Sequence, residues 1–148
     1  MCLAIVQGQS LNVGGVPVVQ GVRHPISVAK AMLKDETILI AGPVTRDFAR
    51  KAELEICIPK GLKMPDQIEH SKRSGTHDTV GCLALDHTGS LAAGTSTSGL
   101  NGKPAGRVRD SLQPCCGYYA ANDVGAVIFW GRRSYRPVHA RSASEEHV

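Results

Sequence analysis

The sequence has few aromatic residues and no long apolar run, and both absences narrow the classes of protein to consider. Phe, Trp and Tyr make up 4% of the 148 residues, whereas 16 glycines are present, which favours tight turns and a core of small side chains. The chain contains no run of 18 apolar residues, so no membrane-spanning helix is expected. A chain of this length is expected to form one domain.

Metal, disulfide and nucleic-acid signatures are missing as well. The five cysteines are odd in number and include no CxxC spacing, so neither a zinc site nor a complete disulfide framework is indicated. The net charge of +4 is spread along the chain, without a dense basic stripe interleaved with aromatics. We therefore expect no metal, no cofactor, no nucleic-acid partner and no membrane contact. Cys82, in an apolar run, is expected in the core.

One peptide bond, between Asp78 and Thr79, would create a nucleophile if it were cut. Thr79 would then carry a hydroxyl and a free α-amine in the same residue. An α-amine has a pKa of about 7.7–8.0 and is partly neutral near pH 7, so it can serve as a base. The alternative is an ordinary strand start, because Asp-Thr is a common dipeptide.

The residues after Thr79 are typical of a β-hairpin. Residues 80–85 form a short apolar run, residues 86–89 are turn formers, and residues 91–94 resume a small apolar run. A hairpin would place the hydroxyl run of residues 95–98 beside Thr79, where it could orient the nucleophile. The alternative is a Ser/Thr loop without a chemical role.

A third segment, Gly106 to Ser111 (GRVRDS), offers a pair of opposite charges three residues apart. The planar guanidinium of Arg107 suits a carboxylate, and the carboxylate of Asp110 could accept from an ammonium. Together they could clamp the two charged ends of a free amino acid. A solvent-exposed ion pair is the competing interpretation.

At these spacings HDTVG, AAGTSTSG and GRVRDS resemble the N-terminal-nucleophile asparaginases, with glycosylasparaginase (aspartylglucosaminidase) as the nearest branch. The earlier segments 11–16, 22–30 and 37–42 resemble the family's part before the cleaved bond. The resemblance covers roughly residues 10–131. It implies an α+β fold, the αββα layered sandwich of these hydrolases, with a partial domain over residues 1–131.

The resemblance also implies roles around the nucleophile. The bond between Asp78 and Thr79 resembles the autoproteolytic bond, Thr79 the nucleophile, and Thr97 the threonine that hydrogen-bonds it. The freed amine of Thr79 would act as the base. The polar stretch 59–78 is expected to be a linker that moves away after cleavage.

The substrate-binding positions match the family with two departures. The resemblance implies that Arg107 holds the substrate α-carboxylate, Asp110 its α-amino group, and the backbone N–H of Gly131 the oxyanion. Arg109 stands where the family usually has a glycine, so a long cation could crowd the pocket or compete for Asp110. Trp130 precedes Gly131 where the family usually has a small hydroxyl residue.

The predicted function is hydrolysis of the side-chain amide of (glycosyl)asparagine, a small-molecule substrate, after autoproteolysis. The run GTSTSG favours the glycosylasparagine-cleaving branch over isoaspartyl peptidases. An inactive family fragment or an interaction protein is the alternative, since the chain looks truncated at both ends. If the chain is active, we expect a homo-oligomer of cleaved α and β chains. The family resemblance implies the lysosome or the cytoplasm as the compartment. Residues 1–6 are too short for a signal peptide. Residues 132–148 are expected to form a disordered tail.

Local patterns predict three further elements. Residues 26–34 have helical spacing with Pro25 in the first turn. Residues 37–41 read as a strand. Thr45 is a good N-cap for a helix that continues through Lys51.

Overall fold

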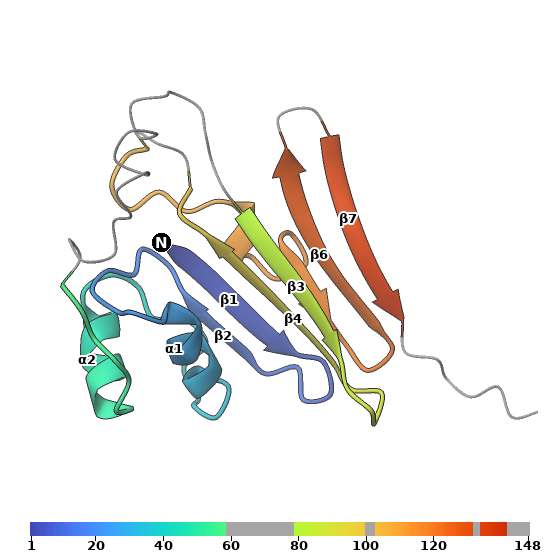
Figure 1. Cartoon of the computed structure of the whole chain (residues 1–148), viewed down its shortest axis with the longest axis horizontal. Coiled ribbons are helices and arrows are strands. Elements are labelled where there is room, and N and C mark those ends of the chain that lie inside the picture. The colour runs from blue at the N-terminus through green and yellow to red at the C-terminus, as the bar shows by residue number, and fades with distance from the viewer. Residues whose placement is uncertain (59–78, 100–102, 132–133, 142–148) are drawn as a thin grey trace, which may run out of the picture.

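The computed structural model describes residues 1–58, 79–99, 103–131 and 134–141 (Figure 1). Residues 59–78, which include the expected linker and Asp78, lie outside this description. The described elements, in chain order, are β1 (Cys2–Gln7), β2 (Val13–Val16), α1 (Pro25–Met32), α2 (Val44–Lys51), β3 (Thr79–Leu85), β4 (Leu91–Thr97), the 3-10 helix η2 (Asp110–Leu112), β5 (Tyr118–Ala120), β6 (Val124–Gly131) and β7 (Ser134–Arg141).

The strands form two antiparallel sheets. The first has the order β2-β1-β4-β3, and the second has the order β5-β6-β7. The β3–β4 hairpin docks along β1, so that Cys2 pairs with Thr97, which in turn pairs with Thr79. The predicted hairpin is therefore present, and a strand from the beginning of the chain forms its other neighbour.

The first sheet separates two cores. On one face it packs against the helices, and on the other against the second sheet, while Figure 1 shows both helices beside β1 and β2. The alternation along β1 divides its side chains between the two faces. The helix-side core contains Leu3, Val16, Val19, Val22, Val28, Ala29, Met32 and Ala49. The core between the sheets contains Cys2, Ala4, Val6, Leu91, Ala93, Leu112, Tyr118, Ala120 and Val127.

The described chain thus has one helical layer and two sheet layers, which confirms a mixed α and β fold with antiparallel sheets. The two α-helices in this description have eight residues each, far fewer than the roughly 20 that a bilayer crossing requires.

Helix α1 begins at Pro25, as its sequence predicts, because proline has the right φ for a first turn and needs no hydrogen-bond acceptor there. It buries Val28, Ala29 and Met32 against the sheet. Close approach depends on Gly14 in β2, where an added Cβ would overlap the carbonyl oxygen of Ala29. A small residue in the strand therefore sets how near the helix can lie.

Two local predictions around α2 were wrong. Residues 37–41 form no strand, and Leu39 makes only a single parallel bridge to Gly15. The N–H of Gly15 donates to the carbonyl of Ile38 at 2.9 Å, and the carbonyl of Gly15 accepts from the N–H of Ile40 at 3.1 Å. The N-cap of α2 is Pro43, while Thr45 is buried within the helix and its hydroxyl donates to the carbonyl of Ile40 at 3.2 Å. A tertiary contact to the preceding segment replaces the expected cap.

The structure also differs from the expected tail. Residues 134–141 form β7, which pairs along β6 from Gly131 opposite Ser134 to Val124 opposite Arg141. Pairing satisfies backbone groups that would otherwise stand free along the edge of β6.

The outer face of the hairpin is less covered than its inner face. Cys82, expected in the core, is exposed, because β3 is an edge strand and α1 lies over β1 and β2. Beyond α1 an apolar depression of about 450 Å³ extends over β3 and β4, with Ile26, Val80 and Ala92 in its lining.

Candidate functional site

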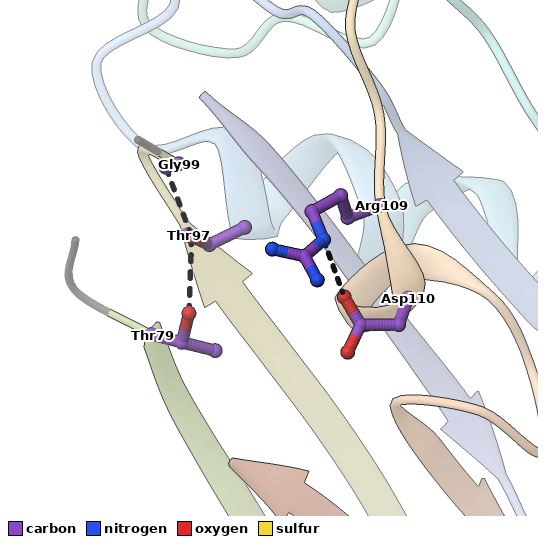
Figure 2. Close-up of polar contacts among 5 residues, drawn as sticks. All are labelled: Thr79, Thr97, Gly99, Arg109 and Asp110. Atoms are coloured by element: carbon purple, nitrogen blue, oxygen red, sulfur yellow. Dashed lines mark hydrogen bonds and ion pairs between the residues drawn. The ribbon is translucent and has the colours of Figure 1, made fainter. Parts of the chain in front are cut away.

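The open end of the hairpin brings two threonine hydroxyls together. Thr79 and Thr97 are directly opposite in the β3–β4 ladder, and the hydroxyl of Thr79 donates to that of Thr97 at 3.2 Å (Figure 2). The backbone N–H of Gly99 donates to the same Thr97 oxygen at 3.0 Å. The position of the nucleophile candidate is thus tied to the register of the hairpin.

The turn at the other end of the hairpin sets this register. The carboxylate of Asp86 accepts from the backbone N–H groups of Thr88 and Ser90 at 2.8 and 2.9 Å, and from the Thr88 hydroxyl at 2.7 Å. These hydrogen bonds lower the pKa of Asp86, and the bond from the Thr88 hydroxyl has the largest effect. Gly89 takes the positive φ of +84° that its turn position requires.

The loop after β4 carries the charged residues of the site and is held to the sheet at Ser111. The buried hydroxyl of Thr95 in β4 donates to the Ser111 carbonyl, and Leu112 next to it is buried in the core between the sheets. Gly117 lies so close that an added Cβ would overlap Asp110 and Ser111. These contacts place the side chains of Arg107, Arg109 and Asp110 beside the open end of the hairpin.

Between the strand ends and this loop lies a small cavity of about 50 Å³. It is well below the roughly 300–1,000 Å³ of pockets that take drug-sized ligands, so it suits only small molecules. The described residues that line it are Cys2, Thr79, Thr97, Gly99, Lys103, Arg107, Arg109, Asp110, Ser111 and Leu112.

An internal ion pair occupies part of the site. The Arg109 Nε lies 3.7 Å from an Asp110 carboxylate oxygen, and the two side chains are 45% and 35% exposed. In Figure 2 the guanidinium of Arg109 lies between Asp110 and the two threonines. The structure therefore places the Arg109 guanidinium next to the Asp110 carboxylate, and competition with a substrate group stays a prediction.

Comparison with known proteins identifies relatives of this chain. The family model described as Asparaginase matches residues 1–74 and 59–132. This chain belongs to the asparaginase family. Its relatives include a plant-type L-asparaginase of Pyrobaculum calidifontis, 32% identical over 88% of this chain and 49% of the relative. An N(4)-(beta-N-acetylglucosaminyl)-L-asparaginase of Elizabethkingia miricola is 31% identical, over 86% of this chain and 41% of the relative.

A human isoaspartyl peptidase/L-asparaginase is 32% identical to this asparaginase-family chain, over 88% of the chain and 47% of the relative. The chain therefore spans less than half the length of each of these three relatives. Relatives named for glycosylasparagine and for isoaspartyl substrates match at similar identity, so the preference for the first branch stays a prediction.

The predicted site residues of this family member fall into two groups. Thr79, Thr97, Arg107 and Asp110 line the same small cavity. Gly131 ends β6 opposite Ser134 and is not among the described lining residues, and Asp78 lies outside the description. The family resemblance had therefore selected residues from three separate segments that the fold brings together.

Lys103 and Cys2 are among the described lining residues that sequence reasoning missed. Lys103 has a local signal, since it stands between the GTSTSG and GRVRDS motifs, and its ammonium donates to the carbonyl of Ser98. Cys2 has none, because only the pairing of β1 with β4 places it beside Thr97. Within the described ranges, no group of three or more His, Cys, Asp or Glu side chains is arranged to hold a metal ion.

Proposed function

We propose that this chain is the core of an amidohydrolase whose nucleophile is Thr79, freed by cleavage of the bond between residues 78 and 79. The observation that carries the proposal is the 3.2 Å contact between Thr79 and Thr97 at a cavity that Arg107 and Asp110 also line. The substrate class is an asparagine-type side-chain amide. Names of relatives support this class, since they refer to L-asparagine and to N(4)-(beta-N-acetylglucosaminyl)-L-asparagine.

The chemistry requires a base, which an internal threonine lacks. Cleavage gives Thr79 an α-amine, which takes the proton of its own hydroxyl as the oxygen attacks the amide carbonyl. The amine then passes the proton to the leaving nitrogen, and an ester to Thr79 remains. Water hydrolyses this ester and releases aspartate, which returns the hydroxyl to its original state.

Thr97 would orient the attacking oxygen, and the loop would orient the substrate. Arg107 offers two parallel N–H donors for the α-carboxylate, and Asp110 an acceptor for the α-amino group. We assign the oxyanion to the backbone N–H of Gly131, which the family resemblance suggests. A donor of this kind is worth roughly 100- to 1,000-fold in rate.

The assembly belongs to the same proposal. We propose that the described layers form part of an αββα sandwich of the N-terminal-nucleophile type, and that cleaved α and β chains associate in an oligomer. The helical layer and the two stacked sheets support this fold.

Mass spectrometry of the purified chain tests the first step. We expect the intact chain to give two fragments, the second beginning at Thr79, and Thr79→Ala to abolish the split. Thr88→Ala, a matched change at the exposed turn of the same hairpin, should leave the split unchanged. Wild-type protein that stays intact while correctly folded would contradict the proposal.

A non-catalytic family member is the second candidate, and the ion pair of Arg109 with Asp110 favours it. In that case the cavity binds a small anion but never acts on it. Two measurements discriminate between these candidates: chain cleavage before Thr79 and ammonia release from L-asparagine. An amidohydrolase shows cleavage and ammonia release, whereas a non-catalytic binding protein shows neither.

A further inference from the structure

Two adjacent cysteines, Cys115 and Cys116, lie in the turn between η2 and β5. All five cysteines of the chain fall within the described residues, and each is a free thiol. Cys115 and Cys116 are both exposed, and neither is among the described residues that line the cavity. The turn therefore presents two accessible sulfurs on consecutive residues.

The backbone of this turn suits a glycine better than the cysteine that occupies it. The carbonyl of Gln113 accepts from the N–H of Cys116 at 3.1 Å, which closes a four-residue turn with Pro114 in second place and Cys115 in third. Cys115 has a φ of +66° there. A positive φ at the third position is typical of a type II turn, where glycine is favoured because other side chains are strained. The Cys115 thiol is thus held beside the second thiol at a conformational cost.

Adjacent exposed thiols can form a disulfide with each other when a peroxide reaches them. The first sulfur attacks a peroxide oxygen, the O–O bond breaks, and a sulfenic acid forms with release of water. The second sulfur then attacks the sulfenic sulfur, the S–O bond breaks, and another water leaves as the S–S bond forms. The thiol pair loses two electrons and two protons, and hydrogen peroxide is reduced to water.

A disulfide between consecutive residues would be easy to reduce again. Neighbouring Cα atoms across a trans peptide are about 3.8 Å apart, whereas the Cα atoms of disulfides are usually about 4.4–6.8 Å apart. The short spacing strains the bond and makes it more reducible. Oxidation of this turn would therefore be a reversible modification rather than a structural cross-link.

The turn packs against the loop that carries Asp110. The N–H of Gln113 donates to the Asp110 carbonyl at 2.8 Å, and the N–H of Gly117 donates to the Gln113 carbonyl at 2.9 Å. A Cβ added to Gly117 would lie 2.5 Å from both the Asp110 carbonyl oxygen and the Ser111 Cα. Because the two backbone segments are in such close contact, a change in the backbone of residues 115–116 would move Asp110.

We propose that Cys115 and Cys116 form a redox modification site, at which a hydroperoxide closes a reversible disulfide that displaces the Asp110 loop. This inference goes beyond the proposed function, since the thiol chemistry requires no hydrolysis and neither sulfur belongs to the described cavity lining. Asp110 does line the cavity, so oxidation would act on the cavity from outside it.

Peptide mapping of the whole chain after treatment with hydrogen peroxide tests the bond. We expect the peptide that contains residues 115 and 116 to lose two hydrogen atoms and both free thiols, and dithiothreitol to restore them. Cys116→Ser should abolish this loss, and so should Cys115→Gly, which also relieves the strained φ.

The matched control is Cys82→Ser, which removes an exposed thiol from the edge strand β3 and should leave the oxidation unchanged. Three results would overturn the proposal: Cys115 and Cys116 stay reduced, they gain oxygen irreversibly, or they pair with another cysteine or another chain.

Hydrogen exchange on the same samples tests the coupling to the loop. Oxidation should speed exchange in residues 107–113, where the N–H of Gln113 bonds Asp110, and leave the hairpin turn of residues 86–91 unchanged. Peroxide should have no such effect on Cys116→Ser. Equal exchange in the reduced and the oxidised chain would refute the displacement. Both measurements apply whether or not the chain splits before Thr79, so their outcome is separate from that of the proposed hydrolysis.

Discussion

The two ends of the β3–β4 hairpin are built in opposite ways. At the turn end, Asp86 alone accepts three hydrogen bonds from Thr88 and Ser90, and Leu91 beside it is 1% exposed. At the open end, a hydroxyl contact joins Thr79 to Thr97, and cationic side chains from the loop after β4 line the same cavity. The first end is stabilised by local contacts, and the second collects groups from three parts of the chain.

The difference indicates that the turn end stabilises the hairpin and that the open end carries the functional groups. Because side chains alternate along a strand, a shift of one residue in the ladder would turn Thr97 away from Thr79. The turn and the buried leucine therefore fix the geometry, whereas the open end can carry polar groups that contribute little to stability. Substitutions at the two ends should separate stability from function.

The largest effect is expected from Thr97→Val, which keeps the side-chain shape and removes the hydroxyl that accepts from Thr79. If Thr97 orients the nucleophile, the rates of self-cleavage and amide hydrolysis should fall roughly 100-fold, similar to the loss of one preorganised hydrogen-bond group. Timed mass spectrometry and ammonia release measure the two rates.

The matched control is Thr88→Val at the turn, which also deletes a hydroxyl from an observed bond, here to Asp86. Both rates should stay near those of the wild type. Equal losses in the two variants would show that the hairpin as a whole, not the position of Thr97, governs the chemistry.

Leu91→Ala should have the largest effect on stability. Leu91 lies in the core between the sheets, and truncation of a buried leucine costs about 2–5 kcal/mol in unfolding free energy. Leu85, its direct partner in the ladder, is 52% exposed, so Leu85→Ala should change stability by no more than about 0.5 kcal/mol. Urea unfolding of both variants checks the contrast, and similar losses would contradict the division into a buried and an exposed member.

The core shared by both ends predicts a fall in stability at alkaline pH. Burial, together with the nearby charge of Cys115, raises the pKa of Tyr118 to about 12, above its ordinary value of 10. Between these pH values the folded state keeps a proton that the unfolded chain loses, so the unfolding free energy falls as pH rises. The stabilising contribution of Tyr118 is on the order of 1–2 kcal/mol; it is fully present below pH 10 and is lost as the pH rises towards 12.

Tyr118→Phe should remove this part of the alkaline loss without harm near pH 7, because the buried hydroxyl has no hydrogen-bond partner among the described residues. Tyr119→Phe, next to it and 37% exposed, should keep the loss. Urea midpoints from pH 8 to pH 12 measure both. An unchanged slope in Tyr118→Phe would assign the effect to another group.

The smallest effect is expected from Asp86→Ala at the exposed turn. The pKa of Asp86 is lowered by bonds from Thr88 and Ser90, so its charged form stabilises the folded state above pH 4, and this contribution fades as pH falls further. The variant should melt at a lower temperature near pH 7 and differ less from the wild type at pH 2–3. A constant difference across this range would show that the charge is not involved.

Short-range patterns predicted the hairpin and the start of α1 correctly. Residues 86–89 carry turn chemistry, and Pro25 can only begin a helix, so each prediction rests on backbone preferences within a few residues. The strand at 37–41 and the cap at Thr45 failed for the opposite reason. In both, contacts to Gly15 or Ile40 outweighed the local preference.

At the site, too, local patterns predicted some positions and tertiary contacts decided the others. Hairpin geometry alone predicted that the 95–98 run lies near Thr79, and the structure places Thr97 at 3.2 Å. The positions of Arg107 and Asp110 followed from family motifs rather than from any spacing rule. The family pattern raised the possibility that Arg109 competes for Asp110, but the geometry of their 3.7 Å contact depends on how Thr95 and Gly117 hold the loop.

The sequence by itself determined the local units: a turn that needs Asp86 and Gly89, a helix that begins at Pro25, and a hydroxyl-rich strand end. Only the tertiary structure decided that β1 pairs with β4 and that the loop of residues 103–112 closes over the strand ends. Local preferences act within a few residues and can be read in order. Packing between distant segments depends on which apolar faces bury each other, and this is determined by all the elements of the chain together.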